Sequence, residues 1–138
     1  MDENETIEKL CDFLIKQGWK IKSKVLAGER GIDVEAIDPN NKLFLIEAKG
    51  STSSKKGSSR FGKPYKKTQV FDVASKGLML CFHHLMKKSS CDIGFVYPAN
   101  KHFSFYIDPL VPMLTSIGLT LFCVHANGHV EIYTKNCN

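Results

Sequence analysis

Residues 43–51, LFLIEAKGS, contain the clearest fold signal in the chain. The four large apolar side chains at 43–46 alternate between the two faces of an extended segment, which is typical of a central strand covered on both sides. The stretch then continues into Glu47, Ala48 and Lys49. Because side chains alternate along a strand, Glu47 and Lys49 point to the same face. A buried strand that ends in a carboxylate and an ammonium is expected to present them to another group.

The composition is that of an ordinary globular domain. The 138 residues suit one domain spanning 1–138, with 43% hydrophobic and 24% charged residues. No apolar run approaches the ~20 residues of a membrane helix, so we expect no membrane association. The first residues, MDENETIEK, are acidic and lack the apolar core of a signal peptide. The expected location is therefore intracellular, in the cytoplasm.

The cysteines and histidines form no standard metal-ligand spacing. The five cysteines are scattered and include no CxxC pair, which argues against a structural zinc site and favours a reducing compartment. They are Cys11, Cys81, Cys91, Cys123 and Cys137. Of His83 and His84, we expect one to be half-buried and the other exposed, because adjacent helical residues point about 100° apart. We expect His125 and His129 to be surface residues.

Positive charge is concentrated in one segment. The net charge is +5, and the stretch from Gly50 to Phe71 holds six basic residues and no acid. The six are Lys55, Lys56, Arg60, Lys63, Lys66 and Lys67. Such a block is typical of a polyanion-binding surface, although a solvated loop that is merely basic is an equal alternative. The Gly/Ser-rich composition around it predicts a mobile loop at about 50–65.

The hydrophobic periodicity predicts an α/β fold. Apolar residues recur at helical spacing from Ile7 to Ile15 and Gly18 follows, so we expect a helix over 5–17, capped by Asn4 or Thr6. A second helix is expected over 66–88, where Gly77 is one possible point of interruption. A short helix is expected over 109–117. Strands are expected over 19–26, 32–38, 43–49, 93–97, 103–107, 119–124 and 129–133. This order predicts a mixed central sheet flanked by helices on both faces.

A second carboxylate is expected beside Glu47. Asp33 lies fourteen residues earlier, near the start of the strand at 32–38. If the strands form a hairpin in which paired residue numbers sum to 80, Asp33 lies opposite Glu47, with Cβ atoms ~5 Å apart. Lys49 then lies on the same face just beyond. A register shifted by one residue would move Asp33 to the other face, so the connection must be of odd length, such as 38–42.

Two carboxylates placed so closely favour a metal ion. Their repulsion raises the pKa of one of them unless a cation joins them. Mg²⁺, or Mn²⁺ in its place, suits an Asp/Glu pair supplemented by a backbone carbonyl and water. Such an ion polarises a phosphoryl oxygen, and the ammonium of Lys49 then stabilises developing charge. Asp33, Glu47 and Lys49 together describe a phosphodiester-cleaving site, whereas a structural salt bridge of Lys49 with either acid is the alternative.

The arrangement of these residues resembles the PD-(D/E)XK nuclease superfamily, the restriction-endonuclease-like folds. The likeness rests on GID (31–33) and EAK (47–49) between an acid-bearing amphipathic helix and a second helix, and it covers roughly 5–97. Small members resembling Holliday-junction resolvases and type IV restriction nucleases are the most similar. The resemblance implies a restriction endonuclease-like αβββαβ core. It also implies Asp33, Glu47 and the Ala48 carbonyl as metal ligands and Lys49 as the catalytic lysine. Ile32 replaces the proline of the motif.

The resemblance also assigns roles to residues of the two helices. An acid in the first helix often assists the metal through water, and Glu8 is our candidate, with Glu5 and Asp12 as alternatives. Gln69 opens the second helix, where resolvase-like members often carry a catalytic Gln. Glu8 and Gln69 as ordinary surface residues remain the alternative readings.

The expected activity is that of a Mg²⁺- or Mn²⁺-dependent endonuclease that hydrolyses DNA, duplex or branched. The six basic residues would hold backbone phosphates, which brings affinity without sequence information. Phe61 and Tyr65 would stack on a base or anchor the loop. A homodimer or larger nuclease assembly is expected because cutting both strands needs two sites. The alternative is a nucleic-acid-binding or assembly module that keeps the fold without turnover.

Overall fold

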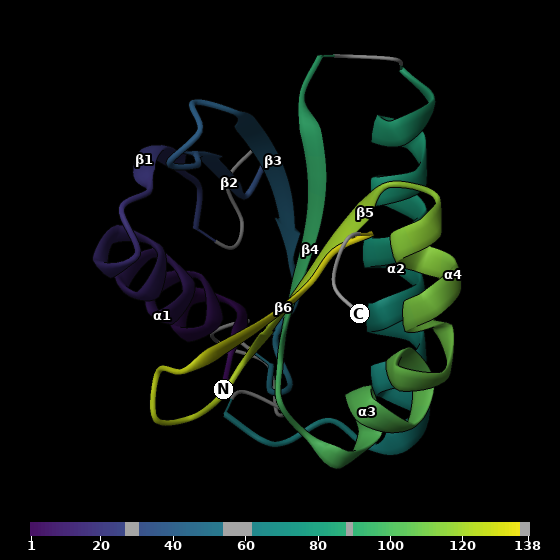
Figure 1. Cartoon of the computed structure of the whole chain (residues 1–138). Helices are drawn as coiled ribbons and strands as arrows, with labels where there is room; N and C mark the ends of the chain where they lie inside the picture. Colours follow the sequence, from purple (N-terminus) through teal and green to yellow (C-terminus); the bar gives the residue numbers. More distant parts are fainter. Residues whose placement is uncertain (27–30, 54–61, 88–89, 136–138) are drawn as a thin grey trace.

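The computed structural model describes residues 1–26, 31–53, 62–87 and 90–135, and it forms a mixed sheet with helices on both faces (Figure 1). The first six elements are α1 (Glu3–Lys16), β1 (Lys20–Lys24), β2 (Val34–Ile37), β3 (Leu43–Ala48), α2 (Lys67–Met86) and β4 (Asp92–Pro98). There follow α3 (Lys101–Ile107), the 3-10 helix η1 (Asp108–Leu110), α4 (Val111–Ser116), β5 (Leu119–Val124) and β6 (Val130–Tyr133).

The six strands lie in the sheet in the same order as in the chain. The pairs β1–β2, β2–β3 and β5–β6 are antiparallel, whereas β3–β4 and β4–β5 are parallel. Helix α1 covers one face, and α2, α3 and α4 cover the other (Figure 1). The mixed sheet flanked by helices that the sequence predicts is thus confirmed.

Two apolar cores separate these layers. Under α1, Ile7, Leu10 and Leu14 pack with Ile46 and Phe122 of the sheet. The core beneath α2 and α3 includes Phe95, Tyr97, Phe103 and Leu121. Central strands are therefore buried on both faces, which explains the continuous apolar run in β3. None of the helices within the described ranges has the length and apolar character that crossing a membrane requires.

The β2–β3 hairpin has the predicted register. Its pairs run from Val34 with Ile46 to Ile37 with Leu43, and each pair of numbers sums to 80. In the turn between them, the Asp38 carboxylate accepts a hydrogen bond of 2.8 Å from the N–H of Lys42. The prediction of register and turn is confirmed, and Asp33, one residue before β2, comes next in line opposite Glu47.

The start of α1 is fixed against the end of β3. Asp2 caps the helix, since its side chain accepts a hydrogen bond of 2.8 Å from the N–H of Glu5, so the predicted caps Asn4 and Thr6 are wrong. A Cβ at Gly50 would lie 2.3 Å from the backbone nitrogen of Glu3, so only glycine allows this approach. The first turn of α1 is thereby held beside the EAK motif.

One further sequence prediction is wrong, and the possible interruption at Gly77 does not occur. The segment 103–107 is a helix rather than a strand, because the Asn100 side chain caps it and Phe103 and Ile107, four residues apart, are the buried positions. Helix α2 also runs without interruption at Gly77. A Cβ at Gly77 would lie 2.5 Å from Cε1 of Phe95, so this glycine makes room for the sheet instead of ending the helix.

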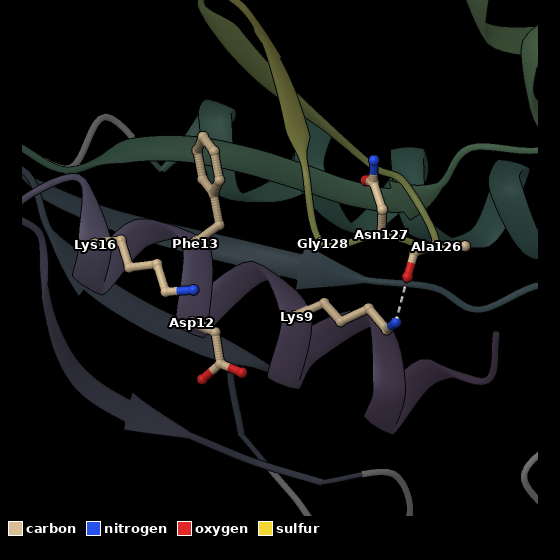
Figure 2. Close-up of a pocket in the computed structure, with 7 residues that line it drawn as sticks. All are labelled: Lys9, Asp12, Phe13, Lys16, Ala126, Asn127 and Gly128. Atoms are coloured by element: carbon tan, nitrogen blue, oxygen red, sulfur yellow. Dashed lines mark hydrogen bonds between the residues drawn. The ribbon is translucent and has the colours of Figure 1, made fainter.

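A shallow surface hollow lies between α1 and the β5–β6 turn (Figure 2). Lys9 closes one end of it, donating a hydrogen bond of 2.6 Å to the carbonyl of Ala126. Asp12, Lys16 and Asn127 line the rest, with Phe13 and Gly128. Of the acids that the sequence analysis considers as metal ligands, only Asp12, an alternative to Glu8, is among the described residues that line this hollow.

Candidate functional site

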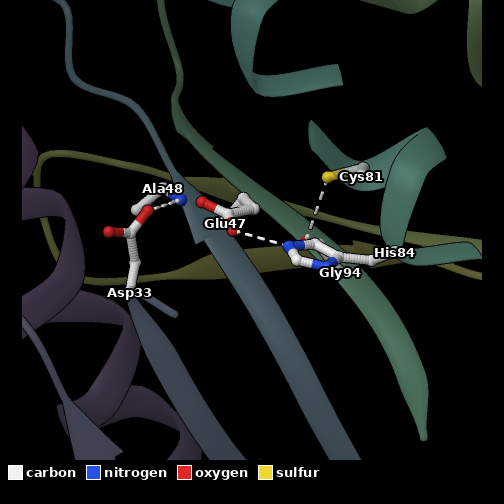
Figure 3. Close-up of polar contacts among 6 residues, drawn as sticks. All are labelled: Asp33, Glu47, Ala48, Cys81, His84 and Gly94. Atoms are coloured by element: carbon white, nitrogen blue, oxygen red, sulfur yellow. Dashed lines mark hydrogen bonds and ion pairs between the residues drawn. The ribbon is translucent and has the colours of Figure 1, made fainter. Parts of the chain in front are cut away.

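Asp33 and Glu47 are brought together at the open end of the β2–β3 hairpin (Figure 3). Oδ2 of Asp33 accepts a hydrogen bond of 2.8 Å from the backbone N–H of Ala48. Glu47 is only 7% exposed, whereas Asp33 is half-buried. The Asp33 carboxylate is therefore tied to the backbone between Glu47 and Lys49, where the sequence predicts a metal site.

The surroundings of Asp33 disfavour the charged form of its carboxyl group. Burial raises the pKa of Asp33 to about 7, against the opposing effect of the Ala48 N–H. The nearby Glu47 and Glu3 carboxylates contribute to this rise. A cation placed between these acids would favour their charged forms and reverse the shift.

His84 of α2 is a member of this site that the sequence analysis did not assign. Its Nε2 lies 2.9 Å from Oε1 of Glu47, and the side chains are 15% and 9% exposed (Figure 3). The prediction that one histidine of the pair is half-buried and the other exposed is confirmed, with His83 being the exposed one. His84 follows Gly77 by two helical turns on the same side of α2, and this spacing was the available signal.

Lys49 lies on the same side of β3 as Glu47, towards α2. A Cβ at Gly77 would come within 3.1 Å of Cγ of Lys49, so the lysine stem runs along the helix there. Burial raises the pKa of Glu3, and the charge of Lys49 opposes that rise. Among the described residues, no ion pair joins Lys49 to Asp33 or Glu47, so the structural salt bridge considered as an alternative is not formed.

Glu8 lies elsewhere. Its carboxylate forms an exposed ion pair with Lys24 of β1, at 2.8 Å, and so is not brought to Asp33 and Glu47. The acid of α1 that shares their electrostatic environment is Glu3, which contributes to the raised pKa of Asp33. The sequence analysis missed Glu3 because it began the helix at residue 5, two residues too late.

Gln69 supports the start of α2. Its Oε1 accepts a hydrogen bond of 2.7 Å from the N–H of Lys66, as in a capping box. This bond satisfies a backbone donor of the first turn, so the described contact of Gln69 is a structural one. The catalytic role that the resemblance implies for Gln69 stays a prediction.

The basic segment begins at this end of the sheet. Thr52 pairs with Pro64, and the N–H of Tyr65 donates a hydrogen bond of 2.8 Å to the carbonyl of Ser51, so the two ends of the segment meet in a short neck. Three of its basic residues, Lys63, Lys66 and Lys67, are exposed. The other three, Lys55, Lys56 and Arg60, lie outside the described residues, as do Phe61 and half of the predicted mobile loop.

Among the described residues, Lys67 is the lysine of this segment that contacts an aromatic ring. Its Nζ lies 3.5 Å from the ring centroid of Phe105 in α3, in a cation–π geometry. Phe105 and Phe71 are both more than half exposed. Positive charge and aromatic surface thus adjoin at the start of α2.

Comparison with known protein families, with curated proteins and with solved structures finds no match for this chain. The functional argument therefore depends on the geometry of the site.

Proposed function

We propose that this protein is a divalent-metal-dependent endonuclease that hydrolyses DNA phosphodiester bonds, built on a restriction endonuclease-like core. The observation that carries the proposal is the placement of Asp33 in line with Glu47, with Lys49 on the Glu47 face of β3. The order of the first six elements, α1-β1-β2-β3-α2-β4, also agrees with the αβββαβ core that the resemblance implies.

The donor set fits a hard divalent cation. Asp33 and Glu47 would supply carboxylate oxygens, the Ala48 carbonyl would supply a backbone oxygen, and Mg²⁺ or Mn²⁺ prefers oxygen ligands of this kind. The pKa of Asp33, raised to about 7, is the mark of a carboxyl group whose charge lacks compensation. When bound, the metal would supply Lewis-acid polarisation of the phosphoryl oxygen and a more acidic water.

The protein side chains would perform the remaining steps. Lys49, with its stem held against α2 at Gly77, would place an ammonium near the attacked phosphate and stabilise its developing charge. Glu3 would orient water at the edge of the site, in the role that the sequence analysis gave to Glu8. Lys63, Lys66 and Lys67, exposed beside the neck, would hold the flanking phosphates.

The contact between His84 and Glu47 favours a second candidate function. A histidine that holds a buried carboxylate can take the place of a metal as its partner. In that case the chain would be a nucleic-acid-binding or assembly module with a nuclease-like site that does not turn over.

The discriminating experiment is cleavage of plasmid and branched DNA in Mg²⁺ or Mn²⁺. We expect the wild type to cut, and Asp33→Asn, Glu47→Gln and Lys49→Ala each to lose about 100-fold or more in rate. Glu35→Gln is the matched control, because Glu35 lies on the same face of β2 as Asp33 but bonds Ser23 at 2.9 Å. It should cut like the wild type.

Two outcomes would overturn the proposal. If the wild type binds DNA but leaves every substrate intact with both metals, the binding module is the better description. If Lys49→Ala cuts as fast as the wild type, Lys49 is not the catalytic lysine even though a nuclease remains.

A further inference from the structure

Three side chains of types that can bind a metal meet near the β5–β6 edge of the sheet. The thiol of Cys123, an imidazole nitrogen of His125 and a carboxylate oxygen of Glu131 lie within 4.8 Å of one another. They belong to β5, to the residue after it and to β6, whereas Asp33 precedes β2 and Glu47 is on β3. With β4 lying between β3 and β5, this cluster is separate from the proposed nuclease site.

The backbone pairing explains why these three side chains converge. Cys123 lies directly opposite Glu131 in the antiparallel β5–β6 ladder. Two residues beyond Cys123, His125 points to the same face, since side chains alternate. Their convergence is thus a property of the hairpin register and does not depend on a long or exposed loop.

The contacts of Glu131 pre-position its carboxylate. Its Oε1 contacts Nε2 of His125, and its Oε2 accepts a hydrogen bond of 2.8 Å from the Tyr133 hydroxyl. His129 lies next to them, with its ring centroid 5.7 Å from that of His125.

The buried hydroxyl of Tyr97 lies on the neighbouring strand. Tyr97 of β4 pairs with Cys123 of β5 and is 1% exposed. Within the described residues its hydroxyl has no hydrogen-bond partner. A buried hydroxyl normally has a partner, so the Tyr97 hydroxyl is a polar group beside Cys123 that is available to a ligand or a water molecule.

We propose that Cys123, His125 and Glu131 bind a zinc ion, with His129 or a water molecule as the fourth ligand. A thiolate, an imidazole and a carboxylate are the ligands of Zn²⁺, whereas Mg²⁺ takes oxygen ligands only. Tetrahedral zinc places ligand atoms about 3.3–3.8 Å apart, so modest side-chain rotation closes the present cluster. The hydroxyl of Tyr133, which holds the second oxygen of Glu131, then orients that ligand from outside.

The bound ion would link β5 and β6 through their side chains. Binding replaces the proton of the Cys123 thiol with a metal–sulfur bond and releases that proton to solvent. Because β6 is a four-residue strand at the edge of the sheet, a cross-strand metal bond would stabilise an element with few other contacts. Zinc at about 100 times its Kd should raise the Tm by about 5–10 °C.

The test is metal binding to the chelator-treated full chain. We expect one equivalent of Zn²⁺ to bind with a Kd of about 1 µM or tighter. Co²⁺ in its place should give a thiolate-to-metal charge-transfer band. Cys123→Ser should abolish that band, and His125→Ala, a substitution at a partly exposed position, should weaken Zn²⁺ binding at least about 100-fold. Cys91→Ser is the matched cysteine control and should bind like the wild type.

The inference fails if wild type binds no Zn²⁺ below about 100 µM. It also fails if folded Cys123→Ser and His125→Ala, checked by circular dichroism, bind as tightly as the wild type. Glu131→Gln serves as a further variant if Cys123→Ser does not fold. Glu47→Gln should retain Zn²⁺ binding, so failure of the nuclease proposal and failure of this one give different results.

Discussion

His84 and Glu47 are joined across the α2–β3 interface, with Nε2 of His84 2.9 Å from Oε1 of Glu47. The two residues are 37 apart in the chain and both are largely buried. A buried carboxylate needs a partner, and this histidine provides one on the side of Glu47 that faces the helix. His84 thereby holds the Glu47 carboxylate from the side of α2.

Removal of His84 should make the protein more dependent on metal. In a chelator, His84→Ala leaves the Glu47 carboxylate without this partner, and we expect a loss of about 1–3 kcal/mol in the free energy of unfolding. Saturating Mg²⁺ should restore more stability to this variant than to the wild type. Urea unfolding with and without Mg²⁺ measures both values. His83→Ala, at the exposed neighbouring position, is the control, and equal losses in the two variants would contradict the assigned contact.

The stability of the metal-free protein should fall as the pH rises from about 4 to about 7, through the titration of Asp33. Burial raises its pKa from 3.8 to about 7, so over this range the folded chain holds a proton that the unfolded chain has released. Asp33→Asn removes this penalty. We expect the variant to be ~1–2 kcal/mol more stable than the wild type at pH 8, after allowance for the partial exposure of Asp33, and about equal at pH 4.

Urea unfolding at both pH values, in chelator, checks the Asp33 prediction. A difference between wild type and Asp33→Asn that stays constant with pH would show that Asp33 does not titrate in this range. Mg²⁺ should stabilise the wild type at pH 8 and leave Asp33→Asn nearly unchanged.

The acid of α1 that serves the site can be identified by comparing two variants. Glu3→Gln should slow DNA cleavage about 10-fold or more, because Glu3 shares the electrostatic environment of Asp33 and Lys49. Glu8→Gln should leave the rate unchanged and cost only a few tenths of a kcal/mol, as expected for an exposed ion pair with Lys24. Cleavage rates and urea midpoints measured on both variants show which of the two acids acts at the site. The reverse pattern would restore the assignment made from sequence.

The parts of the site that were predictable are those fixed by local pattern. The period of two in β2 and β3 and the odd connection at 38–42 determine the hairpin register, and with it the meeting of Asp33 and Glu47. Glu3 and His84 could not be assigned in this way. Their positions depend on the packing of Gly50 against the first turn of α1 and on the direction of α2 across the sheet, which are tertiary contacts.

The wrong prediction for 103–107 has a similar cause. Its aromatic residues have high strand propensity, but the Asn100 cap and the burial of Phe103 and Ile107 on one helical face outweigh that preference. The four-residue spacing was visible in the sequence, whereas the sheet that buries those two side chains was not. The cluster of Cys123, His125 and Glu131 was not predicted from the sequence, because the pairing of β5 with β6 brings these side chains together.

Gly77 should be intolerant of any side chain, although alanine normally favours a helix by about 1 kcal/mol. A Cβ there would lie 2.5 Å from Cε1 of Phe95 and 3.1 Å from Cγ of Lys49. Phe95 is fully buried and cannot move aside easily, so we expect Gly77→Ala to cost about 1–3 kcal/mol. Ser75→Ala, at an exposed position of the same helix, should be neutral or slightly stabilising. Urea unfolding of both variants measures the difference, and a stabilised Gly77→Ala would refute the close packing of α2 on β3 and β4.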